Sequence, residues 1–221
     1  MKSEITTKFS ILALLWGVSF LLLLRVVEAF DWGAAISVRA FIASGSLFLL
    51  SLLLRRKLDF SVGIRHFAVL GATSVSFQLI GLSIAVPRIG TALTAILVGA
   101  IPLFSSVIGR LMKIEEIDQI GFIGLVLGFV GIIFLVGFPS AELGSEFFLG
   151  FFICLAGCIS AAFGSNYSKL RLSNTGNWEQ VIGAFFFGGL FTLPLLLFVP
   201  IKAGLNPSDW VNMVALAVIC S

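Results

Sequence analysis

The chain has 221 residues, of which 59% are hydrophobic and only 11% are charged, and its formal net charge is +3. A soluble domain carries about 25% charged residues, so this composition excludes an ordinary soluble protein and predicts extensive contact with lipid. The basic residues lie at the ends of apolar runs, as topology signals do, which argues against nucleic acid as a partner.

Seven apolar runs of about 20 residues are long enough to form helices that cross a bilayer. We expect spans at 9–28, 33–54, 67–86, 89–109, 119–138, 147–168 and 180–200. An eighth run starts near Trp210 and could cover only about 17 Å before Ser221, which predicts a partial span of a longer protein. The expected fold class is an all-α polytopic membrane protein.

The connections between the runs predict topology. The dipeptide Pro87-Arg88 separates the third and fourth runs and predicts a turn between two antiparallel helices. The first run lacks a cleavage site and is therefore expected to remain as a span. Ten Lys and Arg residues lie on the side of the N-terminus and three on the opposite side, which predicts a cytoplasmic N-terminus.

Two similar segments predict an internal repeat. Trp32 opens the second run and Trp178 opens the seventh, and each follows a run that contains small and polar residues. Five spans per unit would invert the second copy, an arrangement known in secondary transporters. We therefore expect residues 1–140 to form a first five-helix repeat and 141–221 a truncated second repeat.

Several motifs follow one another in a specific order. They are Leu15-Trp16-Gly17-Val18-Ser19-Phe20, Val38-Arg39-Ala40-Phe41, Pro87 to Thr91, Pro102, Glu115 or Glu116, and Gly124 with Gly131. Together they resemble the EamA-type family of the drug/metabolite transporter superfamily. The resemblance implies ten helices in two inverted repeats around a central cavity. It also implies transport of a small organic metabolite by alternating access, which we expect in the cytoplasmic membrane of a prokaryote.

Polar groups inside the apolar runs are candidate solute contacts, because exposing them to lipid is costly. Arg39 is an anion-binding or gating charge, or else it snorkels or pairs with Glu28 or Asp31. Gln78 orients a polar substrate group or joins two helices. The other candidates, each a cavity residue or a packing residue, are Trp16, Ser19, Phe20, Thr91, Thr94, Ser165 and Asn166.

Small residues and a proline predict special backbone contacts. Gly124, Gly128 and Gly131, together with Gly121, form one smooth face of the fifth run. This face packs against another span of the chain or forms a homodimer. Pro102 interrupts the hydrogen bonds of the fourth run, which predicts a kink or a hinge.

No catalytic, metal-binding or cofactor-binding motif is recognisable. His66 is the one histidine and lies beside Arg65 in a cytoplasmic loop, away from catalytic or metal-binding motifs, so we expect it to be a solvated interface residue. An intramembrane lipid-modifying enzyme would have to use the acidic cluster Glu115, Glu116 and Asp118, and a non-transporting scaffold would use the glycine face. No acid lies deep in the seven runs, which favours a facilitator or exchanger, or coupling through spans outside this sequence.

Overall fold

The computed structural model describes residues 2–114, 116, 118–137 and 144–219, and these form helices and short connections without any strand. Within these described residues, five segments are long and apolar enough to cross a membrane, namely Thr6–Phe30, Trp32–Leu53, Ile64–Leu111, Ser145–Arg171 and Asn177–Leu197. The polytopic all-helical class is thereby confirmed. The count of seven spans and the five-helix repeat stay predictions, and the expected boundary at 140–141 lies outside the described residues.

The first two helices form an antiparallel pair with one residue between them. α1 (Lys2–Phe30) ends beside α2 (Trp32–Leu53), and Asp31 adopts a φ of 71° at the joint. Its carboxylate accepts a hydrogen bond from the backbone N–H of Trp32 at 2.8 Å, which caps α2. This cap fixes the entry to α2, the helix that carries Arg39.

The third helical stretch changes its winding halfway. α3 (Ile64–Leu70) continues into η1 (Gly71–Phe77), a π-helical segment, and then into α4 (Gln78–Gly99). Ser76 Oγ donates to the carbonyl oxygen of Gly71 at 3.0 Å and lies 3.2 Å from that of Gly188, so it satisfies backbone groups on two helices. Short π-helical segments are rare and occur often at functional sites.

The chain reverses direction within α4. The reversal occurs at Gly90, whose φ of 79° and ψ of 162° are accessible essentially only to glycine. The turn expected at Pro87-Arg88 is therefore misplaced, because Pro87 is accommodated in the helix and the backbone can reverse only at the glycine. Arg88 Nε lies 2.8 Å from Glu146 Oε2 at the start of α7 and ties the turn to that helix.

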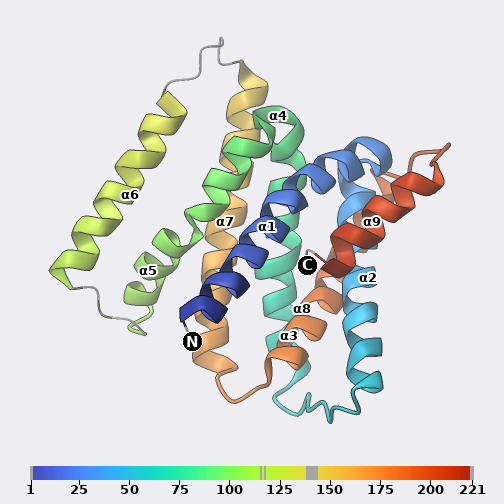
Figure 1. Cartoon of the computed structure of the whole chain (residues 1–221), viewed down its shortest axis with the longest axis horizontal. Coiled ribbons are helices and arrows are strands. Elements are labelled where there is room, and N and C mark those ends of the chain that lie inside the picture. The colour runs from blue at the N-terminus through green and yellow to red at the C-terminus, as the bar shows by residue number, and fades with distance from the viewer. Residues whose placement is uncertain (1, 115, 117, 138–143, 220–221) are drawn as a thin grey trace.

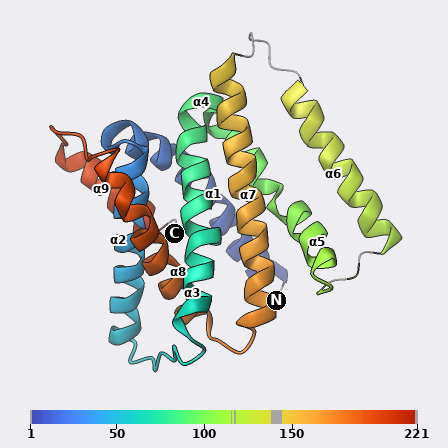
Figure 2. The same ribbon diagram turned by 180° about the vertical axis from the view of Figure 1, so that it is seen from behind.

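The remaining helices complete the bundle. After Gly99 the descending arm is interrupted at Ala100 and continues as α5 (Ile101–Leu111), with Pro102 in its first turn. α6 (Gln119–Gly137) lies at the edge of the bundle, and α7 (Ser145–Arg171) returns through its middle (Figures 1 and 2). α8 (Asn177–Thr192) passes into the 3₁₀ segment η2 (Leu193–Leu197), and α9 (Pro207–Ile219) ends near the centre of the molecule (Figure 1).

Glycine contacts hold the η1–α4 stretch between α7 and α8. A Cβ atom on Gly157 of α7 would lie 3.0 Å from the carbonyl oxygen of Phe77 and 3.3 Å from the Cα of Gly81. On the other side, a Cβ atom on Gly71 would lie 2.7 Å from the backbone nitrogen of Gly188 in α8. Small residues permit this close approach, which drives helix association in lipid.

The glycine face predicted on the fifth run has little contact within the chain. A Cβ atom on Gly128 of α6 would lie 2.7 Å from Leu103, whereas no atom of the described residues lies within 4 Å of a Cβ position at Gly124 or Gly131. The packing contact is therefore present at one of the three positions. A homodimer through this face stays a prediction.

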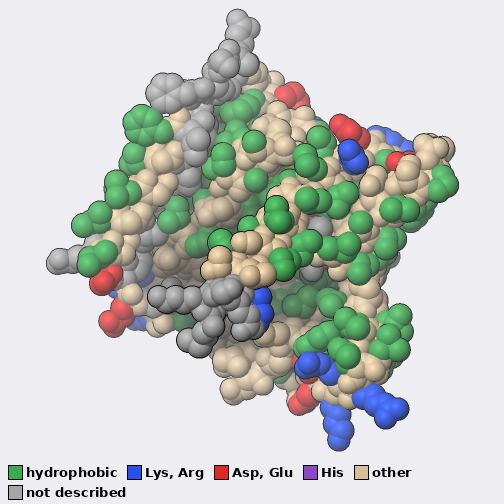
Figure 3. Space-filling view, viewed as in Figure 1, with side chains coloured by type: hydrophobic (Ala, Val, Ile, Leu, Met, Phe, Trp, Pro, Cys, Tyr) green, Lys and Arg blue, Asp and Glu red, His purple; other side chains and the backbone are tan. Residues whose placement is uncertain are grey.

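Charged side chains gather at the two ends of the bundle. Figure 3 shows Lys and Arg at its lower end, near the foot of α2, and both acidic and basic groups at its upper end. Hydrophobic side chains cover much of the visible surface between them. This belt is the surface that a helical bundle presents to lipid, so the chain is a multi-pass membrane protein.

Substitution of Gly157 tests the close contact between α4 and α7. Gly157→Val should lower the free energy of unfolding by about 1–3 kcal/mol, because the new side chain meets backbone atoms that cannot yield. Gly17→Val is the matched control, since nothing lies within 4 Å of a Cβ at that position. Equal thermal unfolding curves for the two variants in detergent would contradict the proposed role of this contact.

Candidate functional site

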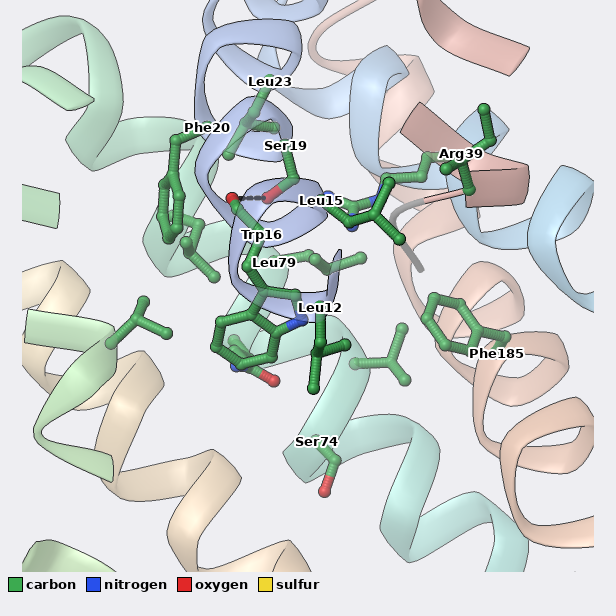
Figure 4. Close-up of a pocket in the computed structure, with 15 residues that line it drawn as sticks. Leu12, Leu15, Trp16, Ser19, Phe20, Leu23, Arg39, Ser74, Leu79 and Phe185 are labelled. Carbon is green, nitrogen blue, oxygen red and sulfur yellow. Dashed lines mark hydrogen bonds between the residues drawn. The ribbon is translucent and has the colours of Figure 1, made fainter. Parts of the chain in front are cut away.

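A cavity of about 340 Å³ lies between α1 and the η1–α4 stretch, and α2, α8 and α9 complete its wall (Figure 4). Most of its lining is apolar, which is typical of sites for small organic molecules. The lining residues are Leu12, Leu15, Trp16, Ser19, Phe20, Leu23, Arg39, Ser74, Val75, Gln78, Leu79, Leu82, Val98, Phe185 and Ile219.

Helical spacing explains why these side chains converge. Leu12, Leu15, Trp16, Ser19 and Leu23 recur at steps of three and four, so they lie along one face of α1. The same spacing places the η1–α4 residues opposite them, and Ser74 lies below the first helix in Figure 4. Two helix faces therefore form the long walls of the cavity.

Four polar groups interrupt the apolar lining. Arg39 is 9% exposed and is the one charged side chain among the lining residues. Within the described part of the chain, neither the Gln78 amide nor the Ser74 hydroxyl has a hydrogen-bond partner, so both are available to a ligand. Ser19 Oγ donates to the carbonyl oxygen of Trp16 at 2.6 Å and retains its acceptor lone pairs. The described lining thus contains one cationic side chain together with hydrogen-bond donors and acceptors, within apolar walls.

A second pocket adjoins the first. It also measures about 340 Å³ and shares Ser74, Val75 and Phe185 with the central cavity. Its remaining lining comes largely from α7 and α8, including Ser165 and Lys169. Lys169 belongs to the last turn of α7, so this pocket extends from the central cavity toward the Lys- and Arg-rich end of the bundle.

The predicted site residues separate into three groups. Trp16, Ser19, Phe20, Arg39 and Gln78 line the central cavity, and Ser165 lines the adjoining pocket. Neither lining includes the remaining candidates, Thr91, Thr94 and Asn166, or the predicted hinge and packing residues, Pro102, Gly124, Gly128 and Gly131.

Two of the residues outside both pockets have structural contacts. Thr94 is fully buried, and its hydroxyl donates to the carbonyl oxygen of Gly90 at 2.7 Å, next to the chain reversal. Asn166 is also fully buried, and its Nδ2 donates to the carbonyl oxygen of Ser105 at 2.9 Å and to that of Ala162 at 3.0 Å. Asn166 therefore joins α7 to α5, while its Oδ1 has no hydrogen-bond partner among the described residues.

The sequence interpretation named five of the cavity's fifteen lining residues, and among those it overlooked are the polar Ser74 and the aromatic Phe185. Ser74 lies in η1 and Phe185 in α8, and both line the two adjoining pockets. The polar residues Thr73, Ser74 and Ser76 in the third run were a usable signal for Ser74. Phe185 is one of several phenylalanines in its run, and no pattern distinguishes it before the fold is known.

Two residues discussed from the sequence have contacts in the structure. His66, expected to be a solvated interface residue, is only partly exposed, and its Nδ1 lies 2.8 Å from the hydroxyl of Tyr167, which joins α3 to α7. Asp31 Oδ2 lies 3.8 Å from Lys202 Nζ, because Lys202 reaches the top of α1 from the connection after η2. The pairing of Arg39 with Glu28 or Asp31 stays a prediction.

The acidic cluster considered for an enzyme is only partly described. Asp118 Oδ1 accepts a hydrogen bond from the backbone N–H of Gly121 at 2.8 Å, which caps α6. Glu115 lies outside the described residues, and Glu116 is exposed in the connection before α6. Among the residues that the structure describes, no three His, Cys, Asp or Glu side chains gather as a metal site.

The sequence profile of the EamA-like transporter family matches residues 8–137, which is more than half of the chain. The chain belongs to the EamA-like transporter family. No curated protein and no solved structure matches it significantly. The matched region of this EamA-like protein runs from α1 to α6 and supplies every cavity residue except Phe185 and Ile219.

The buried amide of Asn166 provides a test of its structural role. Asn166→Ala should lower the free energy of unfolding by about 1–3 kcal/mol, because the substitution removes hydrogen bonds between α7 and α5. Ser165→Ala, one residue earlier and exposed, should leave it nearly unchanged. Thermal unfolding in detergent measures both, and a loss of stability in the Ser165 variant alone would refute the assignment.

Proposed function

We propose that this EamA-like protein is a secondary transporter of small organic metabolites and that the central cavity binds the solute. The observation that carries the proposal is the position of Arg39, a nearly buried cation in an apolar cavity that also contains the unpaired amide of Gln78. A charge is costly inside a membrane and is retained mainly where it has a function.

The lining favours a particular class of solute. One guanidinium group attracts a carboxylate or another anionic group, and it binds such groups through two hydrogen bonds. Trp16, Phe20 and Phe185 provide apolar and aromatic surface for the body of the solute. Amino acids and organic acids therefore fit the cavity better than cationic amines, with nucleosides in an intermediate position.

The architecture supports alternating access. Carrier proteins of inverted-repeat design move one group of helices against another around a site near the middle of the membrane. Here the cavity adjoins the second pocket, which extends toward the Lys- and Arg-rich end. The solute would gain access from that side when that pocket opens, with bending at the Ala100 break between α4 and α5, beside Pro102.

The absence of acids from the two pocket linings bears on coupling. Neither described lining contains Asp or Glu. Transport coupled to protons usually needs an ionisable group with a suitable pKa along the path. Facilitated diffusion or exchange therefore fits the described cavity better than proton coupling through it.

Flux into liposomes tests the proposed function. The reconstituted protein should transport at least one solute from a panel of amino acids, organic acids, amines and nucleosides. Arg39→Gln should raise the KM for an anionic solute about 10- to 100-fold. This factor corresponds to the binding free energy lost when a hydrogen bond to a charged group is removed. Gln78→Leu should also raise the KM, by a smaller factor.

The matched control is Arg110→Gln, because Arg110 is exposed at the end of α5, outside both pockets. Its KM should equal that of the original protein. No flux above empty liposomes for any solute would overturn the proposal. An equal loss in the Arg39 and Arg110 variants would show that Arg39 does not bind solute.

We also propose that the protein lies in the cytoplasmic membrane of a prokaryotic cell, with the N-terminus and the connection between α2 and α3 on the cytoplasmic side. The excess of Lys and Arg at that end supports this orientation. In a background in which Cys154, Cys158 and Cys220 are replaced by alanine, Ser61→Cys should react with an impermeant maleimide only after the cells are permeabilised. Lys202→Cys should react in intact cells, and the reverse pattern would contradict the orientation.

A further inference from the structure

An apolar groove separate from the central cavity lies between α2, α3 and α8. It measures about 560 Å³, and phenylalanines from all three helices and from the connection before α3 line it. They are Phe41, Phe48, Phe60, Phe67, Phe186 and Phe187. None of these residues lines the solute cavity, so the groove has no role in the function proposed above.

The groove is built into the helix packing. Ser44 Oγ donates to the carbonyl oxygen of Ile182 at 3.0 Å and joins α2 to α8 beside it. A Cβ atom on Gly183 would lie 2.6 Å from the ring of Phe67, so α8 and α3 are also in close contact. At Gly45 nothing lies within 4 Å of a Cβ position, which leaves the groove open along α2.

A polar pocket lies beside the groove and is formed by the same two chain segments, the connection after α2 and the start of α8. It measures about 440 Å³ and is lined by Arg56, Lys57 and Leu58 after α2, and by residues 176–179 at the start of α8. The apolar groove uses the following positions of both segments, from Phe60 onward and from Ile182 onward. A basic pocket and an apolar groove are therefore adjacent, with Arg55 and Arg65 exposed on the flanks.

One acid, Glu179, lines this basic pocket, and a second, Asp59, follows the lining residue Leu58 in the chain; both have partners. Glu179 is buried, and its Oε1 accepts a hydrogen bond from the backbone N–H of Asp59 at 3.1 Å. Asp59 is exposed, and hydrogen bonds from Ser61 hold the pKa of its carboxyl below its usual range. Arg56 stacks over the ring of Trp178 at 5.0 Å, which positions its guanidinium beside the pocket.

We infer that the groove and the basic pocket together bind one anionic phospholipid, with an acyl chain in the groove and the headgroup phosphate at Arg56 and Lys57. The order of pocket and groove matches the headgroup and acyl chain of a phospholipid, since the polar pocket lies at the Lys- and Arg-rich end and the apolar groove lies toward the membrane interior. Basic pockets between membrane helices bind anionic headgroups in this way. A soluble peptide fits less well, because the groove faces lipid.

Native mass spectrometry of the purified protein tests this site without any transport assay. The protein is incubated with phosphatidylglycerol or with phosphatidylcholine of identical acyl chains. One phosphatidylglycerol should be retained in preference to phosphatidylcholine. The double variant Arg56→Gln/Lys57→Gln should reduce this preference by up to about five-fold for each cation removed.

Filling the groove tests the acyl-chain position. Gly45→Leu should abolish the retained lipid, and the substitution leaves the fold intact because the position is open. Gly17→Leu, at another open helix position outside the groove, should retain the lipid. Arg110→Gln/Lys113→Gln removes two cations at the same end but away from the pocket and should keep the preference.

Three results would overturn the inference. The first is equal retention of the two lipids, and the second is unchanged binding in Gly45→Leu. The third is a bound species with the mass of a peptide in the protein as purified.

Discussion

Backbone contact through glycine is the interaction on which the rest of this bundle depends. Gly81 and Gly157 bring α4 against α7, and Gly71 and Gly188 bring η1 against α8. In lipid there is no hydrophobic force between helices, so such close packing and interhelical hydrogen bonds hold them together. The η1–α4 stretch is thereby fixed between two helices, and its remaining exposed face becomes a wall of the cavity.

The hydrogen bonds of small side chains follow from the same constraint. Ser76 lies 3.2 Å from the carbonyl of Gly188, Ser37 donates to that of Thr192 at 2.9 Å, and Ser160 donates to that of Thr73 at 3.0 Å. These serines join neighbouring helices and satisfy carbonyl groups that the lipid cannot. Polar residues in the spans therefore serve two purposes, and only their position relative to the cavity distinguishes them.

This dual use explains how far the sequence could predict the site. Hydrophobic length was sufficient for the membrane class, and the motif order identified the family. The sequence identified Arg39 and Gln78 because a polar side chain inside a membrane span costs free energy. It identified the α1 residues because they bring aromatic and hydroxyl side chains together in one span. Thr94 and Asn166 carried the same signal, yet they bond backbone groups at Gly90 and Ser105. Their role depends on which helices meet, and composition does not contain that information.

The π-helical segment η1 has a consequence for how the cavity is aligned. An α-helix advances by about 100° per residue, so one additional residue in a turn rotates every later side chain by that angle. Residues 78–90 thus face directions that a continuous α-helix from Ile64 would not give them. Gln78 follows η1 directly, while Gly81 contacts α7 one turn later. A change of winding within Gly71–Phe77 would therefore rotate the cavity residue Gln78 and the α7 contact at Gly81 together. The shape of the cavity is thus linked to the helix contacts that surround it.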